Sequence, residues 1–124
     1  MNLDNLSCEA YTKYLLDAYS KTPGTTGFVH KADRKVAYAL FEQGVSLKQA
    51  ENALCLGAAR RLFRPNDAPP LQTVRSLAYF LPVIEEVLTT NVGDEYFAHV
   101  RRKLAQFTNE ASHEVNAVSL TMRR

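Results

Sequence analysis

The sequence predicts an all-α fold, a compact bundle of about five to six helices that contains a helix-turn-helix-like hairpin. Two observations carry this prediction. Apolar residues recur at three- and four-residue spacing in successive stretches, and segments rich in proline and glycine separate these stretches. No stretch shows the alternation of apolar and polar residues that is typical of a strand. We expect residues 1–107 to form a single helical domain and residues 108–124, where the periodicity is lost, to form a frayed or disordered tail.

The first helix is predicted in the stretch SCEAYTKYLLDAYS, with Ser7 as its N-cap. Its expected buried stripe follows the helical period and consists of Cys8, Tyr11, Leu15 and Ala18. The helix should end before Pro23, because the following KTPGTTG has the composition of a turn.

The second and third helices are predicted on either side of Gly44. The second runs from about Ala32 to Gln43, and Gly44 supplies the backbone freedom that helix ends commonly need. Ser46 then caps a third helix that keeps its period as far as Phe63. The segment PNDAPP ends this part of the chain.

Two more helical stretches follow. In the first, Thr73 is the expected N-cap, and Pro82 either kinks the helix or begins a new one at its first position. In the second, Asp94 is the expected cap. The apolar stripe of this last helix is the clearest in the chain and consists of Phe97, Val100, Leu104 and Phe107.

The composition is that of an ordinary globular protein. The chain has 124 residues, 46% hydrophobic and 23% charged, and a net charge of +2 that does not by itself indicate a nucleic-acid partner. Cys8 and Cys55 lie far apart on apolar helix faces, so we expect buried, reduced thiols. The polar N-terminus and the absence of a long apolar run favour a cytoplasmic protein with no membrane association.

No pattern in the sequence points to catalysis. The histidines His30, His99 and His113 have no second ligand at metal-binding spacing. Glu85 and Glu86 are adjacent, so they point to different sides of a helix and are expected to be solvated. The glycines of PGTTG lack the lysine of a phosphate-binding loop. We therefore expect a protein that is not an enzyme and has no catalytic residues, metal or cofactor.

Basic residues gather at two places that a helical hairpin would bring together. Lys31, Arg34 and Lys35 lie at the start of the second helix, and Arg60, Arg61 and Arg64 lie at the end of the third, followed by Arg75. These helices are expected to lie antiparallel or steeply crossed. In the antiparallel arrangement the two groups merge into one positive surface suited to a phosphate backbone. These seven residues are the predicted nucleic-acid-binding residues. The alternative is that they are solvated or pair with Asp33, Glu42 and Asp67.

The stretch around Gly44 fits a sequence-reading helix-turn-helix only in part. Ala39, Gly44 and Val45 match the small residue, the turn glycine and the apolar residue of that motif, but Gln43 stands where an apolar residue is expected. A second register would need a glycine near Leu54, and none is present there. The third helix is therefore expected to run unbroken to its arginines.

The order of residues from 33 to 76 resembles that of small helical domains at the C-terminal side of plasmid and phage primases and replication initiators. The matching residues are Arg34, Ala37, Leu40, Gly44, Val45, Ser46, Ala50, Ala53, Leu54, Pro69, Pro70, Leu71, Val74, Arg75 and Ser76. The stretch RSLAYFLPVIEEVL also looks like small uncharacterised bacterial proteins of mobile elements. The resemblance implies an accessory module that contacts duplex DNA or a replication or recombination protein.

A second functional hypothesis stays open, that of a protein-interaction or self-assembling helical module. Tyr79 and Phe80 are adjacent, as are Tyr96 and Phe97, so one ring of each pair should point away from the core. Exposed aromatic rings often mark the surface that binds a partner.

Overall fold

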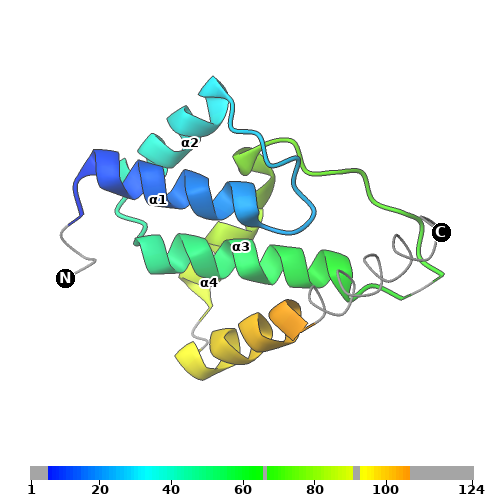
Figure 1. Cartoon of the computed structure of the whole chain (residues 1–124). Helices are drawn as coiled ribbons and strands as arrows, with labels where there is room; N and C mark the ends of the chain where they lie inside the picture. Colours follow the sequence, from blue (N-terminus) through cyan, green and yellow to red (C-terminus); the bar gives the residue numbers. More distant parts are fainter. Residues whose placement is uncertain (1–5, 66, 91–92, 107–124) are drawn as a thin grey trace, which may run out of the picture.

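The computed structural model describes residues 6–65, 67–90 and 93–106 and shows the predicted all-α bundle (Figure 1). Along the chain its elements are α1 (Cys8–Lys21), α2 (Lys31–Glu42), α3 (Leu47–Leu62), the short 3-10 helix η2 (Leu77–Phe80), α4 (Leu81–Thr89) and a last helical stretch over 94–106. No strand occurs in these ranges, where the sole extended pairing is an isolated parallel bridge between Thr25 and Val74.

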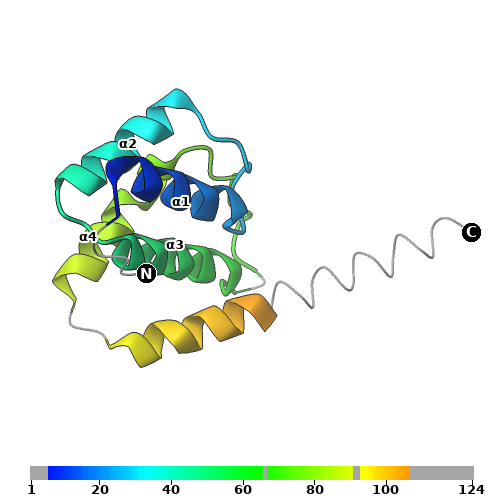
Figure 2. The same ribbon diagram turned by 60° about the vertical axis from the view of Figure 1, so that its left-hand side comes forward.

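Helix α1 packs against two other helices. It lies between α2 and α3 and contacts both, while α4 packs against α3 (Figures 1 and 2). The stretch 94–106 runs alongside α3, where the Arg101 guanidinium donates a hydrogen bond to the side-chain oxygen of Asn52. The largest fully buried apolar side chains are those of Leu15, Tyr19, Leu77 and Phe80. The core therefore joins α1 to the η2 segment far along the sequence.

The predicted caps at Ser7 and Ser46 are confirmed by their hydrogen bonds. The Ser7 hydroxyl accepts from the amide of Ala10 at 3.1 Å. The Ser46 hydroxyl accepts from the amide of Gln49 at 3.1 Å, and the Gln49 side chain accepts from the amide of Ser46 at 3.0 Å. These reciprocal bonds are a capping box, which fixes the start of α3.

Gly44 forms the predicted turn between α2 and α3. Its φ of +81° lies in the left-handed region. The Gly44 amide donates to the carbonyl of Phe41 and the Val45 amide donates to that of Leu40, which is the Schellman pattern of a helix end. Val45 and Leu40 are both buried, so the turn is also anchored in the core. Beyond it, α3 runs unbroken through Gly57 to Leu62, as predicted.

The structure corrects two local predictions and decides between the two arrangements left open at Pro82. Thr73 does not begin a helix, because the next residue, Val74, is extended in the bridge to Thr25, and the helical backbone starts at Leu77. Pro82 lies in the first turn of α4, the second of the two arrangements considered. The last helix begins at Asp94 itself, whose carboxylate pairs with Lys48 at 3.0 Å.

The expected apolar stripes are confirmed in part. Tyr11 and Leu15 are buried on α1, whereas Cys8 and Ala18 are only half-buried, and Leu16 and Tyr19 complete the core face of this helix. Three of the four stripe residues of the last helix are buried, namely Phe97, Val100 and Leu104. The fourth, Phe107, and the predicted tail 108–124 lie outside the described residues.

The two cysteines are more exposed than the sequence led us to expect. Cys8 and Cys55 are unpaired thiols, half-buried rather than fully buried, and desolvation raises the pKa of the Cys55 thiol. None of the helices in the described ranges has both the length and the apolar character that crossing a bilayer requires.

Candidate nucleic-acid interface

The candidate site is organised by Asp33, a carboxylate with 1% exposure in the first turn of α2. One oxygen accepts a hydrogen bond from the backbone amide of His30 at 2.8 Å and so caps α2. The other accepts from the buried amide of Leu77, the first residue of η2, at 2.9 Å. A single side chain therefore receives donors from the starts of two helices, where helix dipoles favour negative charge.

A pairing of two loops lies next to this carboxylate. The amide of Val74 donates to the carbonyl of Gly24 at 2.8 Å, and the amide of Thr26 donates to the carbonyl of Val74 at 3.0 Å. Together with the Asp33 bond, this pairing holds the segment that precedes η2 against the loop that leads into α2 (Figure 1). We call this contact between the two segments the junction. Arg75 lies between Val74 and Leu77 in the sequence, so these contacts place its backbone near the start of α2.

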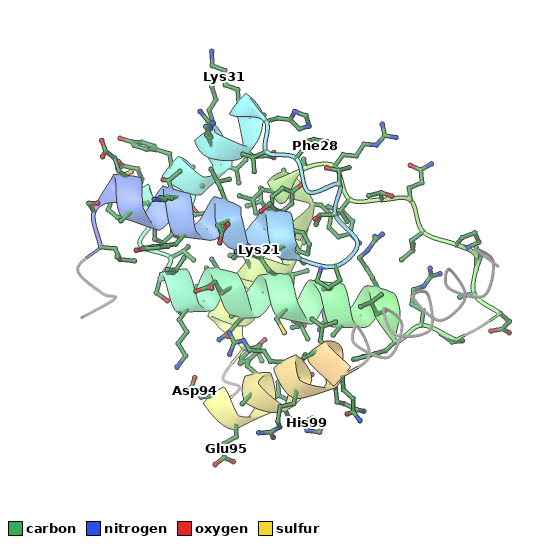
Figure 3. All side chains as sticks on the ribbon, viewed as in Figure 1. Lys21, Phe28, Lys31, Asp94, Glu95 and His99 are labelled. Atoms are coloured by element: carbon green, nitrogen blue, oxygen red, sulfur yellow. The ribbon has the colours of Figure 1, made fainter. Side chains whose placement is uncertain are left out.

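Among the described residues, three exposed cations of the first turns of α2 and one of the segment before η2 are the free basic residues nearest in sequence to these contacts, and we call them the cationic cluster: Lys31, Arg34, Lys35 and Arg75. All four side chains are exposed. Figure 3 shows Lys31 extending from the start of α2 away from the body of the molecule. The ion pairs found in the described residues join other cations, Lys21 with Asp17, Lys48 with Asp94 and Arg60 with Glu86. The cluster thus presents its positive charge to solvent.

The three arginines at and just after the end of α3 form hydrogen bonds within the protein. Arg60 forms a bidentate contact with Glu86 on α4, at 2.7 and 2.5 Å, and hydrogen bonding to Arg60 lowers the pKa of the Glu86 carboxyl. Arg64 donates to the carbonyl of Pro69 at 2.8 Å. Glu86, expected to be solvated, is thus exposed but paired.

Arg61, near the end of α3, contacts the segment that precedes η2. Its guanidinium donates to the carbonyl of Gln72 at 2.5 Å and to the hydroxyl of Tyr79 at 3.1 Å, and it lies 5.3 Å from the centre of the Tyr79 ring. A Cβ atom on Gly24 would lie 3.2 Å from Arg61 Nε. The side chain therefore fills the space between the two paired loops.

The basic residues are thus not brought together in the way the sequence suggested. Helix α2 packs mainly on α1 and η2, and α1 lies between α2 and α3, so the expected antiparallel pairing of α2 with α3 does not occur. The start of α2 meets the segment before η2 instead. Arg75 joins the cluster for this reason, whereas Arg60, Arg61 and Arg64 have intramolecular partners.

Two residues near the cluster were not recognised from the sequence. Asp33 was considered as an ion-pair partner for the basic residues, but it is buried and bound to backbone amides. The three-residue spacing from His30 to Asp33 is that of a capping box and could have indicated the first of these bonds. Phe28, 71% exposed, is the most exposed of the large hydrophobic side chains described. Figure 3 shows it on the loop that leads into α2.

The described residues contain no group of three or more His, Cys, Asp and Glu side chains placed to hold a metal ion. Tyr79 and Tyr96 are about half-exposed beside the buried Phe80 and Phe97, as predicted for the two aromatic pairs. Comparisons of the chain with protein-family models, with curated proteins and with solved structures gave no match.

Proposed function

We propose that this protein is a small helical accessory module that binds the phosphate backbone of DNA through the cationic cluster. The observation that supports this most directly is the exposure of Lys31, Arg34 and Lys35 in the first turns of α2, which the Asp33 bond ties to the segment that carries the exposed Arg75. Backbone phosphates attract such exposed cations without regard to sequence. A role in replication rests on the resemblance of residues 33–76, and a role in a mobile element rests on that of residues 75–88.

The structure divides the predicted nucleic-acid-binding residues into two groups. The four cluster residues are exposed, and their charges are available to phosphates. Arg60, Arg61 and Arg64 would have to give up their bonds to Glu86, to Gln72 and Tyr79, and to Pro69 before they contacted DNA. We therefore assign phosphate contact to the first group and support of the junction to the second.

Phe28 adds an aromatic contact at the edge of the cluster. It lies three residues before Lys31 and two before His30, and its ring is largely in solvent. Exposed aromatic side chains beside cations stack on unpaired bases. Phe28→Ala should therefore weaken binding of a single-stranded oligonucleotide more than binding of a duplex.

The test is fluorescence anisotropy with a labelled DNA duplex over a series of salt concentrations. Each phosphate contact adds about −0.9 to the slope of log K against log[salt], so contact by the whole cluster gives a slope of about −3 to −4. The quadruple variant K31A/R34A/K35A/R75A should lose most of both the affinity and the slope.

The matched control is R102A/K103A, which removes two exposed cations from the stretch 94–106. Figure 3 places this stretch, through Asp94 and His99, on the side of the molecule opposite Lys31. The control should bind as the wild type does. Losses in proportion to the number of charges removed, four in the quadruple variant and two in the control, would show only a general charge effect. Unchanged binding by the quadruple variant would refute the proposed interface.

A further inference from the structure

A second surface lies away from the junction, in the groove between α1 and α2. The groove has a volume of about 1030 Å³, and its apolar lining includes Leu16, Val29, Tyr14 and Tyr38. The two tyrosines are 46% and 53% exposed. Tyrosine is enriched at surfaces that bind other proteins.

The outer face of α1 beside this groove carries a regular pattern of charge. Glu9, Lys13, Asp17 and Lys21 are all exposed and follow one another at every fourth position, so they form one ridge along the helix. Their signs alternate, negative, positive, negative, positive. Lys21 and Asp17 are 3.0 Å apart, yet their side chains remain 75% and 57% exposed and can share a further partner.

This pattern is complementary to itself when it is reversed. Suppose that two copies of α1 run antiparallel about a two-fold axis that crosses the helix at the level of position 15. Glu9 of one copy then lies opposite Lys21 of the other. Lys13 then lies opposite Asp17, so that every facing pair has opposite charges. Packing of helices through their four-residue ridges sets such ridges side by side. A two-fold interface repeats each contact, which gives four ion pairs in all.

We propose that a second copy of this chain docks on this face, with the two α1 helices antiparallel and Tyr14 and Tyr38 of each copy buried at the interface. Burial of the groove supplies the attraction, and the charged ridge sets the direction and register of the two helices. The interface does not depend on the proposed DNA binding. Arg34, which borders the groove and belongs to the cationic cluster, stays unchanged in every variant below.

The experiment measures self-association by sedimentation equilibrium from micromolar to sub-millimolar concentration. Wild-type protein should show a reversible monomer–dimer equilibrium. Lys13→Glu sets two carboxylates against each other at both copies of the contact with Asp17, and Asp17→Lys likewise sets two ammonium groups against each other at both copies of the contact with Lys13. Each exposed pair contributes a few tenths to about 1 kcal/mol, so the two reversed contacts should weaken the dimer at least about tenfold.

Mixing the two variants provides the decisive measurement. In a heterodimer of Lys13→Glu with Asp17→Lys, one of the two central contacts joins the introduced glutamate to the introduced lysine, and the other joins the native Asp17 to the native Lys13. Every facing pair again has opposite charges, so the mixture should associate about as well as the wild type. Tyr38→Ala should weaken all forms, because it removes apolar surface from the groove. Arg102→Glu, an exposed charge reversal on the stretch 94–106, is the control and should leave dimerisation unchanged.

Circular dichroism checks that each variant is folded. A wild-type chain that stays monomeric over the whole concentration range would overturn the proposal. Single variants that dimerise as the wild type does, or a mixture that does not recover association, would overturn the antiparallel arrangement. The DNA-binding assay reads a different set of residues, so failure of either proposal leaves the other measurable.

Discussion

Replacement of Asp33 tests whether one carboxylate holds the two halves of the junction together. Asp33→Ala leaves the amides of His30 and Leu77 without their acceptor. Loss of the buried bond to Leu77 should cost about 2–3 kcal/mol, since the acceptor is charged and the donor stays buried. Loss of the N-cap bond to His30 adds about 1 kcal/mol.

The free energy of unfolding should therefore fall by about 3–4 kcal/mol, a large share of the roughly 5–15 kcal/mol typical of a domain. Urea unfolding followed by circular dichroism measures this change. Asp67→Ala, an exposed carboxylate in the segment between α3 and η2, is the matched control and should change stability by less than about 0.5 kcal/mol. Hydrogen exchange adds a local measurement, because the Leu77 amide should lose its protection. A loss below about 1 kcal/mol, with that amide still protected, would refute the account of Asp33.

Three further predictions concern close packing, a backbone turn and a buried hydroxyl. In Gly57→Ala the new Cβ would lie 2.8 Å from the Phe80 ring, so the variant should lose about 1–3 kcal/mol of unfolding free energy despite its better helix propensity. Adding Phe80→Leu to this variant should recover part of that loss. A Gly57→Ala variant more stable than the wild type would contradict the contact. Gly44→Ala meets no atom within 4 Å but must adopt a φ of +81°, so thermal unfolding should show a loss of about 1 kcal/mol, and an unchanged midpoint would argue against the left-handed turn. Burial raises the pKa of Tyr11 from 10.0 to about 12, and among the residues that the structure describes its hydroxyl has no hydrogen-bond partner. Because the unfolded chain loses this proton first, the stability that Tyr11 contributes is complete below pH 10.0 and falls as the pH rises toward 12, by up to about 2–3 kcal/mol; urea titrations across this range should show the decline in the wild type and a smaller one in Tyr11→Phe.

The sequence predicted those features that depend on neighbouring residues. The Ser7 and Ser46 caps and the Gly44 turn each follow from side chains within a few positions of the helix end. The apolar period located the helices for the same reason. All of these features are short-range, so one sequence contains the information needed to predict them.

The features that were missed depend on distant residues. Whether Asp33 pairs with a lysine or accepts from Leu77 is decided by a segment 44 positions away. Arg60 meets Glu86, 26 positions away, and this partner is visible only once α4 lies beside α3. Thr73 was a reasonable N-cap by composition, but the pairing of Val74 with the loop at Thr25 keeps this segment extended. The predicted basic surface changed accordingly, since Arg60, Arg61 and Arg64 have partners within the protein.

The bond from Asp33 to Leu77 also has a consequence for the order of folding. Local helices form in about a microsecond, whereas contacts between residues 44 apart require closure of a long loop, which is slower. Arg75 reaches the start of α2 only after this closure, so a chain with its early helices formed but its loops unpaired has an incomplete cluster. If the proposed DNA binding holds, nascent or partly folded chains should bind DNA poorly, and recovery of DNA binding during refolding should report the last step rather than the first.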